Sequence, residues 1–396
     1  MTGPLHGIRV VELGGIGPTT FAAMVFADLG ADVIRIDRPD TVNVDVRPPD
    51  FVVTRGRRSV AVDLKTPRGA QLALELTATA DIAIEGWRPG VAERIGVGPA
   101  EAMAVNQRLV YVRATGWGQE GPYAQGPGHD INYLAVTGAL HAIGRRDSPP
   151  VPPLNVVGDY GAGGMLSVVG ALAGLWEARS SGRGQVVDAA MVDGIALLTT
   201  LFHGMLSTGF WTEDREANTV DGGAPWYDAY ETADGKYICV GAGEPHFFNA
   251  LLDLLGLAGE FGDAMERARW PQMRARFAER FRTRTRAEWA THVGDRSLCL
   301  SPVLTWSEAP ADAHLRDRGT FTTVDGVLQP APAPRFSRTP ATITRGAPWP
   351  GEHTAAALTD WGISAESLDE LIDAQVVVQR RDGVILSDSV ASQRFR

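Results

Sequence analysis

The sequence predicts an α/β protein in which a large, doubly wound domain with a parallel sheet is accompanied by a smaller α/β domain. Apolar runs of strand length alternate with helical patterns over the first 112 residues, as is typical of a parallel sheet with helices on both faces. Near residue 225 the pattern changes to two alternating runs around an Asp-Gly turn, which indicates a hairpin. The length of 396 residues exceeds the size at which one hydrophobic core stops growing, so two domains are expected.

The N-terminal region consists of repeated strand–helix–strand patterns. Residues 8–13 form an apolar run of strand type, residues 19–29 have a helical pattern that ends at Gly30, and residues 32–36 form the next strand. The same pattern recurs in helices 69–80 and 99–106, which are followed by strands 82–84 and 109–112. These units predict a parallel sheet with helical crossovers.

Three further elements complete the N-terminal part of the large domain. A helix of small residues at 164–178 leads to a strand at 185–188, and a long apolar helix follows at 190–207. We therefore expect this part of the large domain to span residues 1–207 and a linker to follow at 208–224.

The smaller domain is expected at residues 225–328. Its predicted elements are the hairpin strands 226–232 and 237–240, a helix at 245–255, charged helical stretches within 262–293 and strands that resume near residue 322. Six prolines between residues 329 and 350 exclude a regular helix there, so this segment is predicted to be an extended strap. We expect residues 329–396 to return to the large domain, with a helix at 365–374 and a strand at 376–385.

The bulk composition is that of a globular protein. Apolar residues make up 44% and charged residues 21%, and no run approaches eighteen unbroken apolar residues, so no membrane protein is expected. The net charge of −10 argues against nonspecific binding of nucleic acid. Cys239 and Cys299 are the two cysteines, which supports neither a disulfide framework nor a cysteine metal site. Together with the lack of a visible secretion signal, this favours a cytoplasmic location.

Two proton-transfer groups stand out in separate motifs. His129 lies in Gly-His-Asp-Ile-Asn-Tyr, and Asp159 lies in Asn-Val-Val-Gly-Asp-Tyr, thirty residues later. A reaction that removes a proton from one face of a carbon and returns it to the other needs two such groups. The pair therefore predicts racemase or epimerase chemistry.

Six ordered phrases resemble the alpha-methylacyl-CoA racemases of the class III CoA-transferase (CaiB/BaiF) superfamily. The likeness extends from residue 4 to about residue 340. The phrases lie at residues 10–18, 28–39, 116–119, 128–133, 153–159 and 221–225. The resemblance implies an interlocked homodimer, with a Rossmann-like large domain built from both chain ends and an active site shared between subunits.

The resemblance also assigns roles to three residues. His129 and Asp159 match the two acid/base residues of the family, and Glu244 matches a carboxylate that orients the histidine from the neighbouring subunit. Because Asp159 is predicted to precede a helix, the helix N-terminus would favour its charge, and the same N–H groups could stabilise a thioester enolate.

Coenzyme A is expected to enter as part of the substrate, with no separate cofactor and no metal. Arg38, Arg58 and Lys65 are suited to the adenosine phosphates, and Arg88 and Arg94 to the pyrophosphate. The other predicted contacts to CoA are Gly116, Trp117, Gly118, Gln119, Asp130 and Tyr133. Gly14-Gly-Ile-Gly17 lacks the spacing of a dinucleotide site, which excludes a nicotinamide dehydrogenase.

The predicted function is interconversion of (R)- and (S)-2-methylacyl-CoA thioesters by two-base proton transfer through an enolate. The alternative is a class III CoA-transferase in which Asp159 is a covalent nucleophile. His129 distinguishes these two functions, because two-base chemistry needs an imidazole and the transferase reaction does not. A catalytically idle CoA-binding protein is a third possibility, against which the trio of His129, Asp159 and Glu244 argues.

Overall fold

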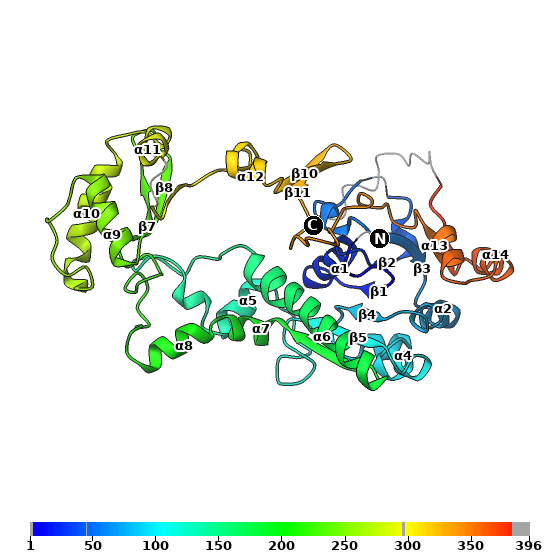
Figure 1. The fold of residues 1–396 in the computed structure, drawn as a ribbon. Coiled ribbons are helices and arrows are strands. Elements are labelled where there is room, and N and C mark those ends of the chain that lie inside the picture. The colour runs from blue at the N-terminus through cyan, green and yellow to red at the C-terminus, as the bar shows by residue number, and fades with distance from the viewer. Residues whose placement is uncertain (1–2, 45, 295–297, 382–396) are drawn as a thin grey trace. The chain divides into compact units, whose positions relative to one another are not determined.

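The computed structural model describes residues 3–44, 46–294 and 298–381 of the chain. The chain forms two compact units, each described here by itself. Unit 1 comprises Met1–Leu134, Leu154–Leu198 and Gly319–Arg396, and unit 2 comprises Ala135–Pro153 and Thr199–Arg318. Unit 1 is thus built from both ends of the chain, with the first strands and the last helices in the same unit (Figure 1).

The division differs from the predicted one in the segment Ala135–Pro153, which belongs to unit 2 although it lies within residues 1–207. Side-chain bonds within unit 2 explain this placement. Arg145 forms ion pairs with Glu216 and Asp228, and Arg215 donates hydrogen bonds to three backbone carbonyls of the segment. Such long-range pairs cannot be read from local sequence patterns.

Unit 1 contains a seven-stranded sheet in the order β12-β3-β2-β1-β4-β5-β6. Its parallel strands are β1 (Arg9–Gly14), β2 (Asp32–Asp37), β3 (Arg58–Val62), β4 (Ile82–Glu85), β5 (Val110–Thr115) and β6 (Val186–Ala190). The short strand β12 (Val377–Val378) pairs with β3 in the antiparallel direction. The strand order reverses between β1 and β4, and ligands of doubly wound folds bind beyond the carboxyl ends of the strands at such a point.

Helices cover both faces of this sheet, which confirms the predicted α/β architecture. The helices of unit 1 are α1 (Pro18–Asp28), α2 (Pro67–Thr77), α3 (Val91–Ile95), α4 (Pro99–Val105), α6 (Leu166–Ser181), α7 (Met191–Leu198), α13 (Thr354–Asp360) and α14 (Ala365–Asp373). Helix α5 (Asp130–Val136) begins in this unit and ends in unit 2. A π-helical segment, Val156–Met165, leads directly into α6.

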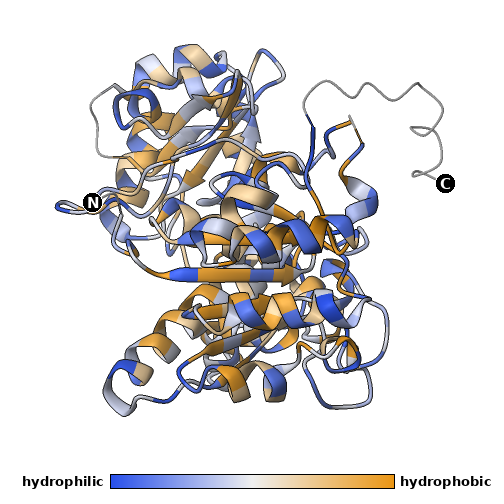
Figure 2. Ribbon diagram, turned by 90° about the vertical axis from the view of Figure 1, so that its right-hand side faces the viewer, coloured by the Kyte–Doolittle hydropathy of each residue, from blue (hydrophilic) through white to orange (hydrophobic). Residues whose placement is uncertain are grey.

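Side chains that alternate along the strands pack into two separate hydrophobic cores, one on each face of the sheet. Val11 and Ile34 point to a core shared with helices α2, α13 and α14, whereas Val10 and Val33 point to a core shared with α1 and α6. Burial on both faces is the reason that these strands appear in the sequence as continuous apolar runs. Figure 2 shows hydrophobic and hydrophilic residues interleaved along the helices, as helices with one buried face require.

Several elements differ from the prediction. Strand β3 and helix α13 were not predicted, and the expected helix at 190–207 is broken into α7 and α8 (Thr200–Ser207). The strand expected at 376–385 is reduced to β12, and its part beyond residue 381 lies outside the described residues. The hairpin of β10 (Phe321–Val324) and β11 (Val327–Pro330) belongs to unit 1, although it falls within the predicted small domain.

Unit 2 contains an antiparallel sheet of β7 (Tyr227–Glu231), β8 (Tyr237–Gly241) and β9 (Leu300–Pro302). Its other helices are α9 (Pro245–Leu255), α10 (Trp270–Phe281), α11 (Arg286–Val293) and α12 (Ala313–Asp317). An aromatic core holds these elements together, in which Trp226 packs edge-on against both Phe248 and Trp270. The predicted hairpin around the Asp-Gly turn is confirmed by the pairing of β7 with β8.

One helical stretch of the described chain, Val156–Ser181, is long and apolar enough to cross a membrane by length and composition alone. The expectation from the sequence concerned unbroken apolar runs, and this stretch is interrupted by Asp159, Glu177 and Arg179. The core helix of a soluble protein can meet the same criteria, and this stretch contacts β5 and β6 within unit 1.

A buried arginine ties the hairpin β10–β11 to helix α1. Arg55, whose side chain is 4% exposed, donates to Asp28 Oδ2 at 2.6 Å and to Gln329 Oε1 at 2.8 Å. We expect Arg55→Met to lower the free energy of unfolding of unit 1 by about 3–5 kcal/mol, because it leaves a buried carboxylate without its partner. Arg38→Met, which breaks an exposed pair with Asp40, is the control and should cost roughly 0–1 kcal/mol. Urea unfolding followed by circular dichroism measures both, and equal losses would contradict this role of Arg55.

Candidate active site

Asp159 lies at the point where the strand order reverses. The glycine turn after β1 ends at Gly17, whose φ of 59° lies in the left-handed region, and α1 begins at the next residue without a side-chain cap. A Cβ atom at Gly17 would lie 3.2 Å from Cγ of Asp159. The Asp159 carboxylate is therefore next to the N-terminal end of α1, which carries the positive partial charge of the helix dipole.

The backbone of Asp159 is held by a second carboxylate. The Asp159 N–H donates to Oδ1 of Asp130 at 2.8 Å, and Asp130 is 8% exposed. A Cβ atom at Gly158 would lie 2.3 Å from the same oxygen, so this contact requires glycine at that position. Burial raises the pKa of Asp130, and the nearby Asp159 charge adds to the rise, while the N–H groups of Asp159 and Gly158 oppose it.

The segments that carry the two predicted acid/base residues are thereby joined within unit 1. His129 directly precedes Asp130 at the start of α5, its side chain is exposed, and its N–H donates to Oδ1 of Asn132 at 3.0 Å. The contact between Asp130 and Asp159 joins the segment that carries His129 to the segment that carries the carboxylate.

One structural expectation about Asp159 is wrong. Asp159 does not precede its helix but lies inside the π-helical segment Val156–Met165, and its N–H is used by Asp130. The uncapped helix end beside its carboxylate belongs to α1, a distant part of the chain. The π-helical segment is long, and π-helical turns are frequently found at functional sites.

The predicted CoA loop at 116–119 packs against the helix of His129. Trp117 meets the Tyr133 ring edge-on at a centroid distance of 4.7 Å, and a Cβ atom at Gly116 would lie 2.1 Å from that ring. Gly118 N–H donates to Thr115, and Gln119 N–H donates to Asp188. The loop and the start of α5 therefore form one packed region.

The charge of Asp159 affects the pKa of Tyr133, a residue of this packed region. Burial raises the pKa of the Tyr133 hydroxyl, the Asp159 charge raises it further, and Arg88 opposes the rise. Arg88 is therefore near enough to this region to affect it, and its side chain is exposed.

The remaining predicted phosphate-binding residues fall into two groups. Lys65 and Arg94 are exposed, and Arg38 is exposed in an ion pair with Asp40. Arg58 differs, because it is buried and pairs with Asp32 at 2.6 Å and with Asp360 at 2.7 Å. Arg58 thus joins β2, β3 and α13, which does not favour the predicted phosphate contact.

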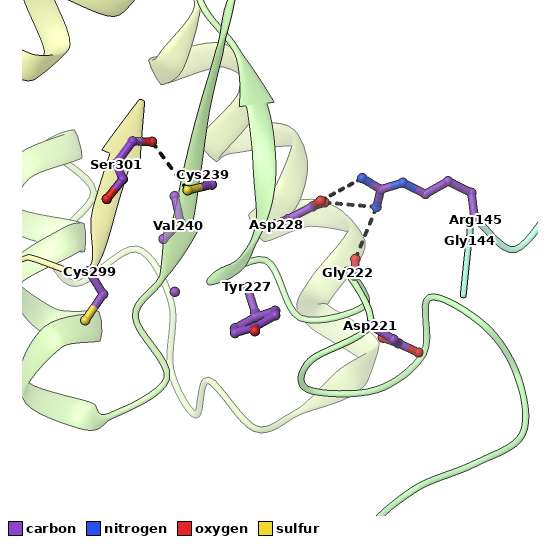
Figure 3. Close-up of a pocket in the computed structure, with 11 residues that line it drawn as sticks. Gly144, Arg145, Asp221, Gly222, Tyr227, Asp228, Cys239, Val240, Cys299 and Ser301 are labelled. Atoms are coloured by element: carbon purple, nitrogen blue, oxygen red, sulfur yellow. Dashed lines mark hydrogen bonds and ion pairs between the residues drawn. The ribbon is translucent and has the colours of Figure 1, made fainter. Parts of the chain in front are cut away.

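Glu244 lies in unit 2, at the residue before α9, and is exposed. The same unit has an open cavity of about 620 Å³ on one face of its sheet (Figure 3). Tyr227, Cys239 and Cys299 line the cavity, and Arg145 bonds to Asp228 and to the Gly222 carbonyl at its edge. Its size is in the range of small-molecule pockets.

The sequence analysis did not identify two contributors to these sites. Asn155 donates from Nδ2 to Oδ2 of Asp159 at 3.0 Å, and Arg145 forms the edge of the cavity in unit 2. The four-residue separation of Asn155 and Asp159 is a helical contact spacing, so the first could have been found from the sequence. Arg145 could not, because its partners are more than seventy residues away.

Comparisons with known proteins identify the family to which the chain is similar. The family model described as CoA-transferase family III matches residues 5–354. The chain is 41% identical to the mouse (Mus musculus) protein named alpha-methylacyl-CoA racemase, over 94% of this chain and 97% of that one. It is 28% identical to the mouse protein named succinyl-CoA:glutarate CoA-transferase, over 90% of this chain and 86% of that one.

A solved structure has the same fold. The crystal structure of a CAIB/BAIF family protein from Brucella suis matches with a TM-score of 0.80 and 27% identity, over 91% of this chain and 100% of that one. The family match covers most of the chain and includes His129, Asp159 and Glu244. The chain therefore belongs to CoA-transferase family III.

Proposed function

We propose that this protein is a racemase that interconverts (R)- and (S)-2-methylacyl-CoA thioesters by two-base proton transfer. The observation that carries the proposal is the junction at Asp130, which joins the segments of His129 and Asp159. The racemase relative, at 41% identity over nearly the full length of both chains, supports the same chemistry.

Each half of the reaction needs one base and one acid. One of His129 and Asp159 takes the α-proton of the thioester, and the electron pair of the broken C–H bond moves into the thioester as an enolate. The other residue then donates a proton to the opposite face of the same carbon, so that the configuration inverts and the total charge is conserved. When the two residues exchange these roles, the reaction converts the other enantiomer.

The surroundings of the two residues suit this exchange of roles. The uncapped start of α1 lies beside the Asp159 carboxylate, and Asn155 donates a hydrogen bond to the same carboxylate. We propose that Glu244 of the neighbouring subunit accepts a hydrogen bond from His129, which fixes its tautomer and raises the basicity of the other ring nitrogen.

We propose that CoA enters as part of the substrate and that the enzyme uses no separate cofactor. The exposed side chains of Arg38, Lys65, Arg88 and Arg94 would bind its phosphates, and the loop 116–119 would lie along the pantetheine. We propose a cytoplasmic location, which the low cysteine content favours, and we propose that neither nucleic acid nor a membrane is a partner.

The alternative is a CoA-transferase. Asp159 would attack the thioester carbonyl, release CoA thiolate and form an acyl-enzyme anhydride. The thiolate would then attack the Asp159 carbonyl, which releases the donor carboxylate and leaves a CoA thioester of Asp159, and an acceptor carboxylate would take the CoA by the same two steps in reverse. The 28% identical transferase relative favours this alternative, but it gives no role to His129. The two reactions differ in whether the α-proton is lost.

Proton NMR in deuterium oxide distinguishes the two functions. We expect one enantiomer of a 2-methylacyl-CoA to lose its α-proton signal and to become a mixture of both enantiomers, because each base is replenished by solvent deuterium. Transfer of CoA to an added free carboxylic acid, without loss of the α-proton signal, would reject the racemase and favour the transferase.

We also propose that the protein is an interlocked homodimer, with an active site shared between subunits. Unit 1 exposes large apolar side chains along the helices that follow Asp159. They are Met165, Val169, Trp176, Leu197 and Leu198, with exposed fractions from 41% to 74%. Apolar surface of this kind favours contact with a second copy of the chain.

Dimer formation can be tested with Trp176→Glu, which places a charge in the apolar surface. We expect the variant to sediment as a monomer at concentrations at which the wild type is a dimer, and to lose racemase activity because Glu244 would come from the other subunit. Val105→Glu is the control, since Val105 is exposed on α4 rather than along α6 or α7. A fully active monomer would contradict the shared site.

A further inference from the structure

Asp130 is a buried carboxylate that follows His129 in the chain and contacts the backbone of Asp159. It was predicted to contact CoA, yet its Oδ1 atom lies on the backbone N–H of Asp159 at 2.8 Å, with 8% of the residue exposed. Buried carboxylates need hydrogen-bond donors, and two backbone N–H groups of the Asp159 turn supply them.

The contact is specific to the two segments that carry the acid/base pair. Asp130 is the first residue of α5 and follows His129 directly, so it is rigidly connected to the imidazole-bearing residue. Its acceptor atom fixes the peptide between Gly158 and Asp159, and the close approach leaves no room for a side chain at Gly158. A shift of either segment would break this hydrogen bond.

The side chain of Asp159 has its own, separate supports. Asn155 donates to its Oδ2 atom at 3.0 Å, and Gly17 lies against its Cγ atom. These contacts orient the carboxylate, whereas Asp130 fixes the backbone from which the carboxylate extends. The distance between the two proton-transfer groups therefore depends on Asp130.

We propose that Asp130 is a positioning residue, which holds Asp159 at the distance from His129 that proton delivery to the second face of the substrate requires. This inference rests on the racemase proposed above. Misplacement of a reacting group by about 1 Å can cost roughly 100-fold in rate. Loss of the Asp130 acceptor should therefore impair the Asp159 half of the reaction and spare the His129 half.

The test compares Asp130→Ala with Asp130→Asn, with each enantiomer of a 2-methylacyl-CoA supplied separately in deuterium oxide. In Asp130→Ala we expect inversion to fall roughly 100-fold. The enantiomer deprotonated by His129 should still exchange its α-proton, whereas the other enantiomer should stop exchanging. Asp130→Asn keeps an acceptor oxygen, so its inversion should stay within about tenfold of the wild type, because a neutral hydrogen bond is roughly half as strong as a charged one.

Asp81→Ala is the matched control. Asp81 accepts a hydrogen bond from the Arg9 N–H at 2.8 Å, at the amino end of β1. It therefore also joins distant segments, but at the end of the sheet away from Asp159. It should leave the ratio of inversion to exchange unchanged. If Asp130→Ala folds poorly, Gly158→Ala disturbs the same contact from the other side and should give the same asymmetry.

Hydrogen exchange measured by mass spectrometry separates this inference from the proposed function. In Asp130→Ala the peptide that contains Asp159 should exchange faster than in the wild type, whatever reaction the enzyme catalyses. Unchanged amide exchange in that peptide, or an equal loss of α-proton exchange with both enantiomers, would overturn the positioning role. A wild type that never exchanges the α-proton would instead reject the racemase.

Discussion

The reversal of strand order between β1 and β4 determines where the chemistry of unit 1 is placed. The glycine turn that follows β1 lies at this point, and because Gly17 has no side chain, the Asp159 carboxylate can approach the start of α1. Apolar cores support the sheet on both faces, so the carboxyl ends of its strands are held in fixed positions. On such a rigid support, a few hydrogen bonds are sufficient to set the position of a carboxylate.

The chain between the two proposed acid/base residues passes through unit 2. The chain leaves unit 1 at Leu134, five residues after His129, and returns at Leu154, five residues before Asp159. Between these points it is anchored in unit 2 by Arg145 and Arg215. Most residues between His129 and Asp159 therefore belong to unit 2. The hydrogen bond from the Asp159 N–H to Asp130 joins the segment where the chain leaves unit 1 to the segment where it returns.

The sequence was sufficient for the elements whose patterns are local. The first βαβ unit has strands with apolar centres, Val10-Val11 and Val33-Ile34, and a helix ended by Gly30, so it was predicted to within two residues. Strand β3 was missed because it begins with Arg58 and Ser59, which are buried through ion pairs and hydrogen bonds to distant residues. Helix α13 was missed because its support comes from β3 and β12, through Thr354.

In the candidate site, too, only the residues that belong to local motifs were predictable from the sequence. His129 and Asp159 could be found from their motifs, since each motif is local. The contacts of Asp159 with Gly17 and Asp130 join distant segments and depend on the fold, so no spacing in the sequence indicates them. Arg58 matched a plausible ligand-binding pattern, but its two carboxylate partners are visible only in three dimensions.

Two-base chemistry is tested most directly with His129→Ala and Asp159→Ala, each assayed in deuterium oxide with the separate enantiomers of a 2-methylacyl-CoA. Because each variant retains one base, we expect each to exchange the α-proton of one enantiomer, a different one in the two variants, and neither to invert its substrate. Inversion by His129→Ala at the wild-type rate would contradict the central role given to the imidazole.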